Sequence, residues 1–525
     1  MRLRRLFVSS VAALVTVVLP IVASAETVIR FVMQSDVKIL DPIWSGAYIT
    51  RNYGYMIYDT LFSMDEQFQV KPQMIDTWKQ SDDGLTWTFT LRDGLEWHDG
   101  TPVTAEDCVA SLKRWSARDS MGQKLASYLS EYKVVDAKTF QIVLKQKFGP
   151  MLEALGKPSV VVPFMMPKRV AETDPFTQIN ETIGSGPFIL KKDEWKPGEK
   201  MVFIKNPKYK PRPEPISGMA GGKKVLVDRV EWIWIPDPET QVNALINGEI
   251  DGIESLGFDY VPLLEKTKGV KILKNPFSNQ FVFRPNWLQP PLNNQKVRQA
   301  IAYALSQPEV MEANVGDKRF FHVCKAMFTC DSPFASTAGM DGLIDGNVAK
   351  AKELLKEAGY DGTPIVMPQP TDLGVIKQIA PVVQSQLAKV GIKVDVQPMD
   401  WQSMVTRLGT KKGPPSEGGW NAYGTSWSQV DILDPLMTPN LIATCEKARS
   451  GWPCDEKLEK LRDEFVQATT PEARKKAAEA VQTYAMQVVT HVPLGEWYGL
   501  AAVRSNIDFP EPLPPVTEFW GVSKK

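Results

Sequence analysis

The amino-acid sequence predicts a mixed α/β (or α+β) protein that folds into more than one lobe. The chain has 525 residues, and a single hydrophobic core stops growing near roughly 300 residues. Segments that alternate like strands and segments with helical periodicity both occur along it. Mixed elements of this kind without internal repeats are typical of α/β and α+β folds. At least two domains are therefore expected.

The first 25 residues have the pattern of a cleavable secretory signal. A start rich in arginine precedes an apolar run over residues 6–21, and small residues follow at positions 23–25. A transmembrane anchor is the alternative, but Pro20 and the small-residue exit shorten the run below the roughly 20 residues that a span needs. No Cys follows the cleavage site, which disfavours a lipoprotein. We expect export to the periplasm.

Net charge excludes some partners. The chain has 61 Lys+Arg and 61 Asp+Glu, and removal of the signal takes away three Arg and no acid, giving (61 − 3) − 61 = −3. A near-neutral surface creates no strong field for nucleic acid or an anionic membrane. The adjacent Arg4 and Arg5 resemble a twin-arginine motif, so the Sec and twin-arginine export routes both stay open.

The cysteine spacing predicts two disulfides. In an exported protein, five cysteines indicate disulfides plus one spare thiol. We pair Cys324 with Cys330 and Cys445 with Cys454, because each couple is close in sequence. Cys108 lies in an expected helix and is interpreted as a buried apolar residue. A zinc site is the alternative for the four paired cysteines, but their long separation and only three His disfavour it.

The clearest local pattern covers residues 78–115. Residues 86–91 alternate apolar groups with Thr, which predicts a half-buried strand. A second short strand is expected at 95–97, and a helix capped by Thr104 at its start runs to about residue 115. A proline-rich tail over residues 510–515 is expected to be extended on the surface. Further strands are expected at 27–32, 201–204, 230–235, 250–253 and 392–396, and helices at 49–62, 241–246, 297–305, 348–358, 376–390, 458–468 and 472–488.

Four blocks of sequence resemble the dipeptide/oligopeptide-type (family 5) bacterial extracellular solute-binding proteins. The first covers the Ser-Asp-Asp-Gly-Leu-Thr-Trp and Trp-His-Asp-Gly-Thr-Pro runs at 81–107. The second begins with Gly-Ser-Gly-Pro-Phe at 184–188, the third is 296–304, and the fourth covers 351–360 and 386–392. They occur in the family's order and span nearly the whole chain after the signal.

The resemblance implies a two-lobed α/β periplasmic-binding-protein fold of type II. Lobe one would cover residues 26–282 plus 495–525, with an inserted subdomain at about 69–180, and lobe two would cover 283–494. It implies a monomer without a cofactor that closes over a solute and docks on the inner-membrane permease of an ABC importer, with its ATPase. Peptides are the expected solutes; a sugar, an opine, glutathione, haem or a metal chelate is the alternative.

Candidate binding residues lie mainly in the aromatic and glycine-rich segment 419–435. In peptide-binding relatives a segment at this place presents an Asp to the ligand's α-ammonium group. Asp431 is our candidate, although the register leaves Asp434 open; a turn or cap before Pro435 is the preferred interpretation of Asp434. The other candidate ligand contacts are Trp427, Tyr423, Trp420, Trp401, Trp44, Ser45 and Gly46, with core packing as the alternative for each Trp.

The sequence disfavours an enzyme. It contains no G-x-S-x-G, H-E-x-x-H or P-loop motif, and its three His are scattered. A pair of carboxylates for glycosidase chemistry stays open, because Asp and Glu are plentiful. An exported hydrolase is thus the weaker alternative, and a chemoreceptor or chaperone partner with the same fold is the third.

Overall fold

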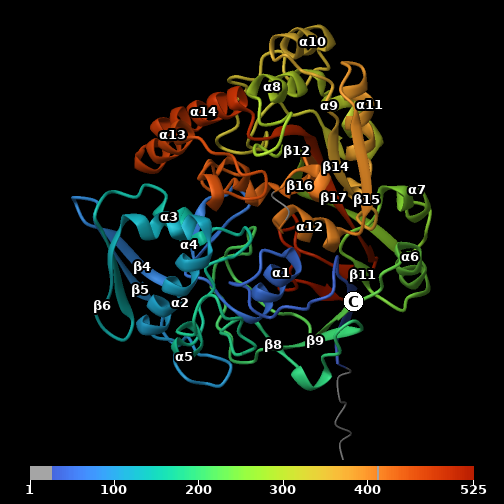
Figure 1. The fold of residues 1–525 in the computed structure, drawn as a ribbon. Coiled ribbons are helices and arrows are strands. Elements are labelled where there is room, and N and C mark those ends of the chain that lie inside the picture. The colour runs from blue at the N-terminus through green and yellow to red at the C-terminus, as the bar shows by residue number, and fades with distance from the viewer. Residues whose placement is uncertain (1–25, 411–412) are drawn as a thin grey trace, which may run out of the picture.

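A computed structural model describes residues 26–410 and 413–525, so the expected signal lies outside the described residues. The chain forms two lobes that meet along a broad junction, with both α-helices and β-strands in each (Figure 1). None of the helices in the described ranges combines the length and the apolar character that a membrane crossing needs.

A nine-stranded sheet connects the two lobes. Strand β1 pairs in parallel with β10 and β11, and the other pairings along the sheet are antiparallel. In order across the sheet, the strands are β16 (Ala422–Ser428), β12 (Val270–Pro285), β17 (Val492–Arg504), β11 (Gly252–Ile253), β1 (Val28–Val32), β10 (Arg229–Ile233), β9 (Lys200–Lys205) and β8 (Phe188–Leu190), with β13 (Phe321–His322) beside β17.

Strands β12 and β17 run together from one lobe to the other. The first half of β12 pairs with the end of β17 that also contacts β11, and its second half lies between β17 and β16. The register shifts between Lys274 and Ser278, in the middle of the pair. Irregular pairing of this kind bends a strand locally. The two lobes are therefore joined by a continuous pair of strands that is bent near its centre.

The lower lobe in Figure 1 carries an inserted subdomain. Residues of β5 alternate between partly exposed and buried, as the Thr and apolar pattern predicts. Thr104 and Asp107 form a reciprocal capping box at the start of α2. The subdomain contains the sheet β4 (Ile75–Gln80), β5 (Thr86–Leu91), β7 (Thr139–Leu144) and β6 (Leu129–Val134), with α2 (Ala105–Arg118), α3 (Ser120–Tyr128), α4 (Met151–Gly156) and α5 (Lys168–Ala171). The rest of this lobe adds α1 (Tyr48–Ile57), α6 (Pro238–Asn247), α7 (Val261–Leu264) and the hairpin β2 (Phe62–Met64) and β3 (Val70–Pro72).

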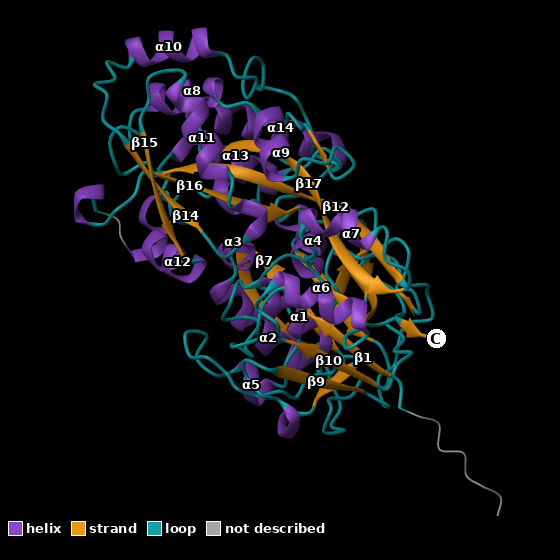
Figure 2. Ribbon diagram, turned by 90° about the vertical axis from the view of Figure 1, so that its right-hand side faces the viewer, coloured by secondary structure: helices purple, strands orange, loops and turns teal. Residues whose placement is uncertain are grey.

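The upper lobe is mainly helical, and α10 and α8 lie at its far end (Figure 2). Helix α14 begins with Pro471 after the cap Thr470, as expected from the sequence. The lobe contains α8 (Gln295–Ala304), α9 (Gln307–Asn314), α10 (Val348–Glu357), α11 (Ile379–Ala388), α12 (Trp401–Thr410), α13 (Glu456–Gln467), α14 (Pro471–Val488) and the parallel pair β14 (Ile365–Pro370) and β15 (Val394–Met399).

Three local expectations were wrong in part. The helix expected at 49–62 ends at Ile57, and Phe62 starts strand β2. The short strand expected at 95–97 is only an isolated bridge between Glu96 and Pro102. The chain after the proline-rich tail turns inward, and Trp520 is buried. The tail contacts residues that are distant in sequence, for example through the Gly521 N–H and the Lys224 carbonyl, so a local pattern cannot report its burial.

Both expected disulfides are present. Cys324 pairs with Cys330, and Cys445 pairs with Cys454. Cys108 is free and buried in α2, as expected. Burial raises the pKa of the Cys108 thiol well above its ordinary value, so the group stays neutral and unreactive.

Candidate functional site

Asp431 is a buried carboxylate at the junction of the two lobes. The residue is only 1% exposed and lies in the short turn that follows strand β16. The Tyr48 hydroxyl at the start of α1 donates a hydrogen bond to Asp431 Oδ2 at 2.6 Å, and the Val160 N–H donates to Oδ1 at 3.2 Å. Within the described ranges, no basic side chain forms an ion pair with Asp431. The site therefore holds a buried carboxylate that is hydrogen-bonded but forms no ion pair among the described residues.

Tyr48 is held in its neutral form. Burial, followed by the charge of Asp431, raises the pKa of Tyr48 well above its ordinary value. Its hydroxyl also accepts a hydrogen bond from the Ser428 N–H at 3.1 Å. The Arg51 guanidinium carbon lies 4.5 Å from the centre of the Tyr48 ring. Tyr48 thus links α1 to both the end of β16 and the candidate anchor.

The predicted segment from Trp44 to Gly46 lies close to this junction. A β-carbon placed on Gly46 would be 3.9 Å from Val160 Cγ2, so Gly46 is a neighbour of the residue that donates to Asp431. Arg118 stacks on the Trp44 ring at 4.5 Å and donates to the Trp44 carbonyl at 3.0 Å. Ser45 Oγ accepts from the Ala47 N–H at 3.1 Å. The structure therefore brings Gly46 towards Asp431, while Trp44 and Ser45 make local contacts.

Trp427 lies four residues before Asp431, on strand β16. It packs with Val282 and Ile432 and is 8% exposed. Its indole N–H is buried and has no hydrogen-bond acceptor among the described residues. The exposed Arg449 places its guanidinium carbon 4.6 Å from the Trp427 ring centre, from the loop closed by the disulfide between Cys445 and Cys454.

The other aromatic candidates of this segment belong to a packed cluster. Trp420 has no exposed surface, and its ring centre lies 5.3 Å from that of Tyr423 and 5.7 Å from that of Trp452. Trp401 is half-buried at the start of α12 and packs against the same cluster. The structure thus places Trp420 in the interior of the upper lobe, which is the core-packing alternative, and separates it from Trp427.

Asp434 caps the turn that contains Pro435. Its Oδ1 accepts hydrogen bonds from the N–H groups of Leu436 at 2.7 Å and Met437 at 2.8 Å. Burial raises the pKa of the Asp434 carboxyl. The preferred interpretation of Asp434 as a turn or cap is confirmed, and Asp431 is the acid of the two that reaches the other lobe.

A pocket of about 470 Å³ lies beside Asp434, between the two lobes. Helices α13 and α14 lie directly above α3 and α4 in both views (Figures 1 and 2). Contacts that join these elements include the Gly149 N–H to the Val466 carbonyl at 2.9 Å and an ion pair between Glu153 and Arg474 at the pocket. The pocket has the size of a small-ligand site, roughly 300–1,000 Å³.

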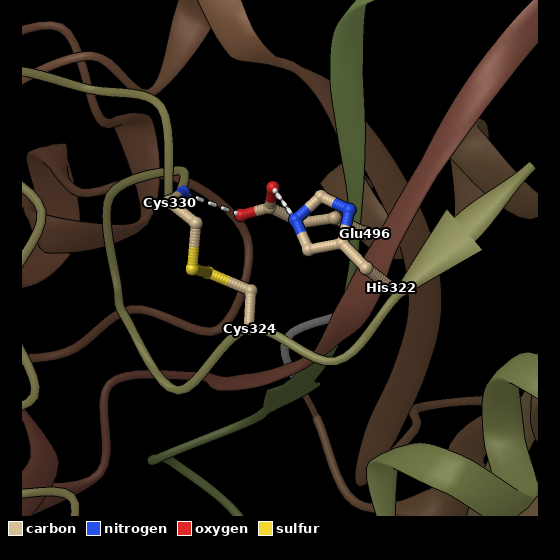
Figure 3. Close-up of side chains that lie close together, drawn as sticks. All are labelled: His322, Cys324, Cys330 and Glu496. Atoms are coloured by element: carbon tan, nitrogen blue, oxygen red, sulfur yellow. Dashed lines mark hydrogen bonds and ion pairs between the residues drawn. A yellow bond between two sulfur atoms is a disulfide. The ribbon is translucent and has the colours of Figure 1, made fainter.

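The three histidines do not form a catalytic or metal group together. Burial lowers the pKa of His98 to about 4 and that of His491 to about 3. His322 lies 3.0 Å from the buried carboxylate of Glu496, which raises its pKa (Figure 3). Glu496 also accepts from the Cys330 N–H at 3.0 Å, and Cys330 is bonded to Cys324. Because both sulfur atoms are in the disulfide, this cluster is structural in the form described.

Three residues of the site were missing from the sequence prediction. Tyr48 and Val160 contact Asp431 across the junction, and Arg449 covers Trp427. The hydrogen bond from Tyr48 joins residues 383 positions apart. No local pattern marks such a pair, because the contact exists only when the two lobes meet. The sequence gave one indication for Arg449, because this residue lies in the loop between Cys445 and Cys454, which were predicted to form a disulfide.

A comparison with known proteins identifies the family to which this chain is related. The model of bacterial extracellular solute-binding proteins, family 5, matches residues 69–450. A probable peptide ABC transporter periplasmic-binding protein of Sinorhizobium fredii is 38% identical over 480 residues, covering 90% of this chain and 89% of the relative. The glutathione-binding protein GsiB of Escherichia coli K12 is 27% identical over 399 residues, covering 75% of this chain and 73% of the relative.

Solved structures show the same fold. The periplasmic binding protein DppA from Helicobacter pylori, in complex with the peptide STSA, matches with a TM-score of 0.79 at 22% identity, over 95% of this chain and 98% of that chain. The oligopeptide-binding protein AppA from Bacillus subtilis, in complex with a nonapeptide, matches with a TM-score of 0.78 at 20% identity, over 95% and 99%. The family match and the 38% identical relative show that this chain belongs to the bacterial extracellular solute-binding proteins of family 5.

Proposed function

We propose that this protein is the solute-binding component of an ABC importer and that it captures peptides between its lobes. The observation that carries the proposal is Asp431, a buried carboxylate at the junction without a basic partner among the described residues. The relative from Sinorhizobium fredii, described as a probable peptide-binding component of such a transporter, supports this assignment.

Asp431 has the chemistry to anchor an α-ammonium group. An ionised carboxylate offers about four acceptor sites. Tyr48 and Val160 use two of them, so two remain for a ligand. A peptide N-terminus that loses its water on closure needs such a partner, since an unpaired buried charge costs several kcal/mol. A charge-assisted hydrogen bond between the peptide α-ammonium group and the Asp431 carboxylate gives each buried charge a partner of opposite sign.

Closure is expected to bend the strand pair β12 and β17. We place the hinge at the register shift between Lys274 and Ser278, with lobe one at residues 26–282 plus 495–525, its insert at about 69–180, and lobe two at 283–494. Hinge closure around a ligand is the common motion of periplasmic binding proteins. Loss of closure on binding to an inner-membrane permease would then release the solute.

We also propose that the protein is exported and works outside the cytoplasm. Residues 1–25 would be removed on export, and the remaining chain would work as a periplasmic monomer that binds its solute without chemical change. The two disulfides fit an oxidising compartment. Glutathione, which the relative GsiB is named for, also carries an α-ammonium group and is the second candidate solute.

The decisive experiment tests recognition of the ligand's N-terminus. Purified protein is stripped of bound solute by unfolding and refolding, screened against peptides by thermal shift, and titrated by calorimetry with the best peptide and its N-acetylated form. Wild-type protein is expected to prefer the free N-terminus by about 100-fold, roughly the 2.7 kcal/mol expected for a charge-assisted hydrogen bond. Asp431→Asn, which keeps the shape, is expected to lose this preference.

Two results would contradict the proposal. One is an Asp431→Asn variant with the same preference for free over acetylated peptide as the wild type. The other is the absence of binding by every peptide, while glutathione or a sugar binds. A melting curve of the variant separates lost binding from lost folding. Asp431→Asn keeps one acceptor oxygen for the Val160 N–H, but its amide nitrogen cannot accept from the Tyr48 hydroxyl.

A further inference from the structure

Four side chains of metal-ligating type meet where β13 and the loop after it pack on β17. They are His322 on β13, Cys324 and Cys330 on the loop, and Glu496 on β17 (Figure 3). One possible ligand atom of each, namely a ring nitrogen, two sulfurs and a carboxylate oxygen, lies within 4.8 Å of the others. In the part of the chain that the structure describes, no other group of three or more His, Cys, Asp or Glu side chains meets in this way. Thiolate, imidazole and carboxylate are the ligands that Zn²⁺ takes in proteins.

The disulfide between Cys324 and Cys330 blocks such a site in the form described. Metal ions bind the thiolate, and a sulfur in an S–S bond is not a thiolate. Opening the bond takes two electrons and two protons. A dithiol reductant supplies both, since it is itself oxidised to a disulfide while the Cys324–Cys330 bond breaks and leaves two thiols. Cys330 is exposed and His322 partly exposed, so a reductant and a cation can both approach from solvent.

The loop that carries the two cysteines is held by contacts other than the disulfide. The buried Gln307 side chain accepts from the Cys324 N–H at 2.9 Å and donates to the Cys324 carbonyl at 2.7 Å. The buried Gln482 side chain accepts from the Met327 N–H at 3.0 Å. Because these contacts do not involve sulfur, the loop is expected to keep its place when the S–S bond opens.

The four ligand atoms need only small movements to surround a cation. Bonds of about 2.3 Å to sulfur and about 2.0 Å to nitrogen or oxygen put the ligand atoms of a tetrahedral site about 3.3–3.8 Å apart. The His322 ring nitrogen already lies 3.0 Å from the Glu496 carboxylate. That carboxylate is oriented by the Ser278 hydroxyl and the Cys330 N–H, which both donate to it at 3.0 Å. Partners of this kind fix the direction of a ligand before the metal arrives.

We infer that reduction of the Cys324–Cys330 disulfide converts this cluster into a site for one Zn²⁺ ion, with His322, the two thiolates and Glu496 as its ligands. Binding releases the two thiol protons. The cation then ties the loop to β13 and β17 after the covalent link has opened. Mg²⁺ and Ca²⁺ are excluded by the two sulfur ligands, because these ions prefer oxygen. The inference does not depend on which solute the protein captures.

The second disulfide offers a matched control. Cys445 and Cys454 also close a short loop, but among the described residues no His, Asp or Glu joins them at the same spacing. Cys445→Ser with Cys454→Ser removes this pair and leaves the proposed site intact. Cys324→Ser with Cys330→Ser removes the two proposed thiolates. His322→Gln keeps all the cysteines and removes only the imidazole, from a side chain that is 32% exposed.

The test is a Zn²⁺ titration of the full-length mature protein in competition with a chromogenic chelator. The protein is reduced with dithiothreitol and freed of it by gel filtration without oxygen. Reduced wild type and the Cys445/Cys454 variant are each expected to bind one Zn²⁺ per chain with a dissociation constant below about 1 μM. The oxidised wild type and the Cys324/Cys330 variant are expected to lose this binding. His322→Gln is expected to weaken it at least about tenfold. Co²⁺ is expected to give the charge-transfer absorption of bound thiolate wherever Zn²⁺ binds.

Each outcome decides the inference. Absence of Zn²⁺ binding by the reduced wild type overturns it, and so does equal binding by the Cys324/Cys330 variant. Unchanged affinity in His322→Gln overturns the four-ligand site and also supplies the answer if the double variant does not fold. Melting curves of the reduced wild type are expected to shift upward with Zn²⁺ relative to a chelator. A reduced protein that stays unfolded with Zn²⁺ present likewise overturns the site.

Discussion

Tyr48 of the lower lobe donates a hydrogen bond of 2.6 Å to Asp431 of the upper lobe, and these two residues are 383 positions apart in the chain. Tyr48 also accepts from the Ser428 N–H. One phenol thus makes two contacts across the junction, and both are lost if the lobes separate. The Asp431 carboxylate is also the proposed ligand anchor. The same group therefore takes part in closure of the lobes and in binding of the ligand.

Tyr48→Phe is expected to favour the open form. Loss of a hydrogen bond to a charged group costs about 1.5–3 kcal/mol, and this loss falls on the closed form only. Small-angle scattering is expected to show a larger radius of gyration for the stripped variant than for the stripped wild type. Tyr260→Phe is the control, because the Tyr260 hydroxyl has no hydrogen bond among the described residues; an equal effect of both substitutions would contradict the assignment.

The sequence predicted the elements that are stabilised locally. The alternation in Thr86–Leu91 and the cap at Thr104 were both confirmed, since strand faces and helix caps depend on neighbouring residues. Both disulfides were predicted for the same reason, because short spacing brings the sulfur atoms together. The two-lobed arrangement came from the resemblance of whole blocks to a family.

What the sequence could not predict are contacts made by the tertiary fold. Trp420 and Trp427 lie seven positions apart in one aromatic segment, yet the first is fully buried and the second lies under Arg449. Which element covers each ring depends on α12 and on the disulfide loop. Likewise, Asp431 was a candidate from the resemblance, but its partners Tyr48 and Val160 are known only from the structure.

Trp420 and Trp427 are expected to separate stability from binding. Trp420→Ala leaves a cavity beside Tyr423 and is expected to lower the free energy of unfolding by about 3–5 kcal/mol. Trp427→Leu keeps an apolar group near Val282 but removes the stack with Arg449. Urea denaturation is expected to show the larger loss for Trp420→Ala, and peptide titration the larger loss for Trp427→Leu. The reverse order would show that the two roles are assigned to the wrong rings.

Glu153→Gln is expected to weaken peptide binding about three- to tenfold. Glu153 and Arg474 form an ion pair across the junction, with 25% and 14% of their side chains exposed. A partly buried pair between lobes stabilises the closed form, and its loss raises the dissociation rate. Stopped-flow measurement is expected to show faster release with a nearly unchanged association rate.

A matched ion pair within one lobe serves as the control for Glu153→Gln. Glu357 pairs with Lys296 at 2.8 Å on the surface of lobe two, with about half of each side chain exposed. An exposed pair contributes little to stability, and this one does not bridge the lobes. Glu357→Gln is expected to leave the release rate unchanged, so an equal change in both variants would exclude a specific role for Glu153.

His322 is expected to give the stability a pH dependence of known sign. Glu496 raises the pKa of His322 above its ordinary value, so the pair stabilises the folded state fully below about pH 6.5. The contribution is lost as the pH rises through the raised pKa. The stability difference between wild type and His322→Gln, measured by urea denaturation, is therefore expected to be largest near about pH 6 and to shrink towards about pH 9.

His98 supplies a control with the opposite sign. Burial lowers the pKa of His98 to about 4, so the unfolded chain binds a proton at this residue before the folded chain does. Stability is then lost as the pH falls below about 6.5. The difference between wild type and His98→Asn is expected to decrease towards acid, whereas that for His322→Gln increases. Parallel pH profiles for the two variants would contradict the ion pair between His322 and Glu496, because only a charged partner can raise the affinity of one histidine for its proton while burial lowers that of the other.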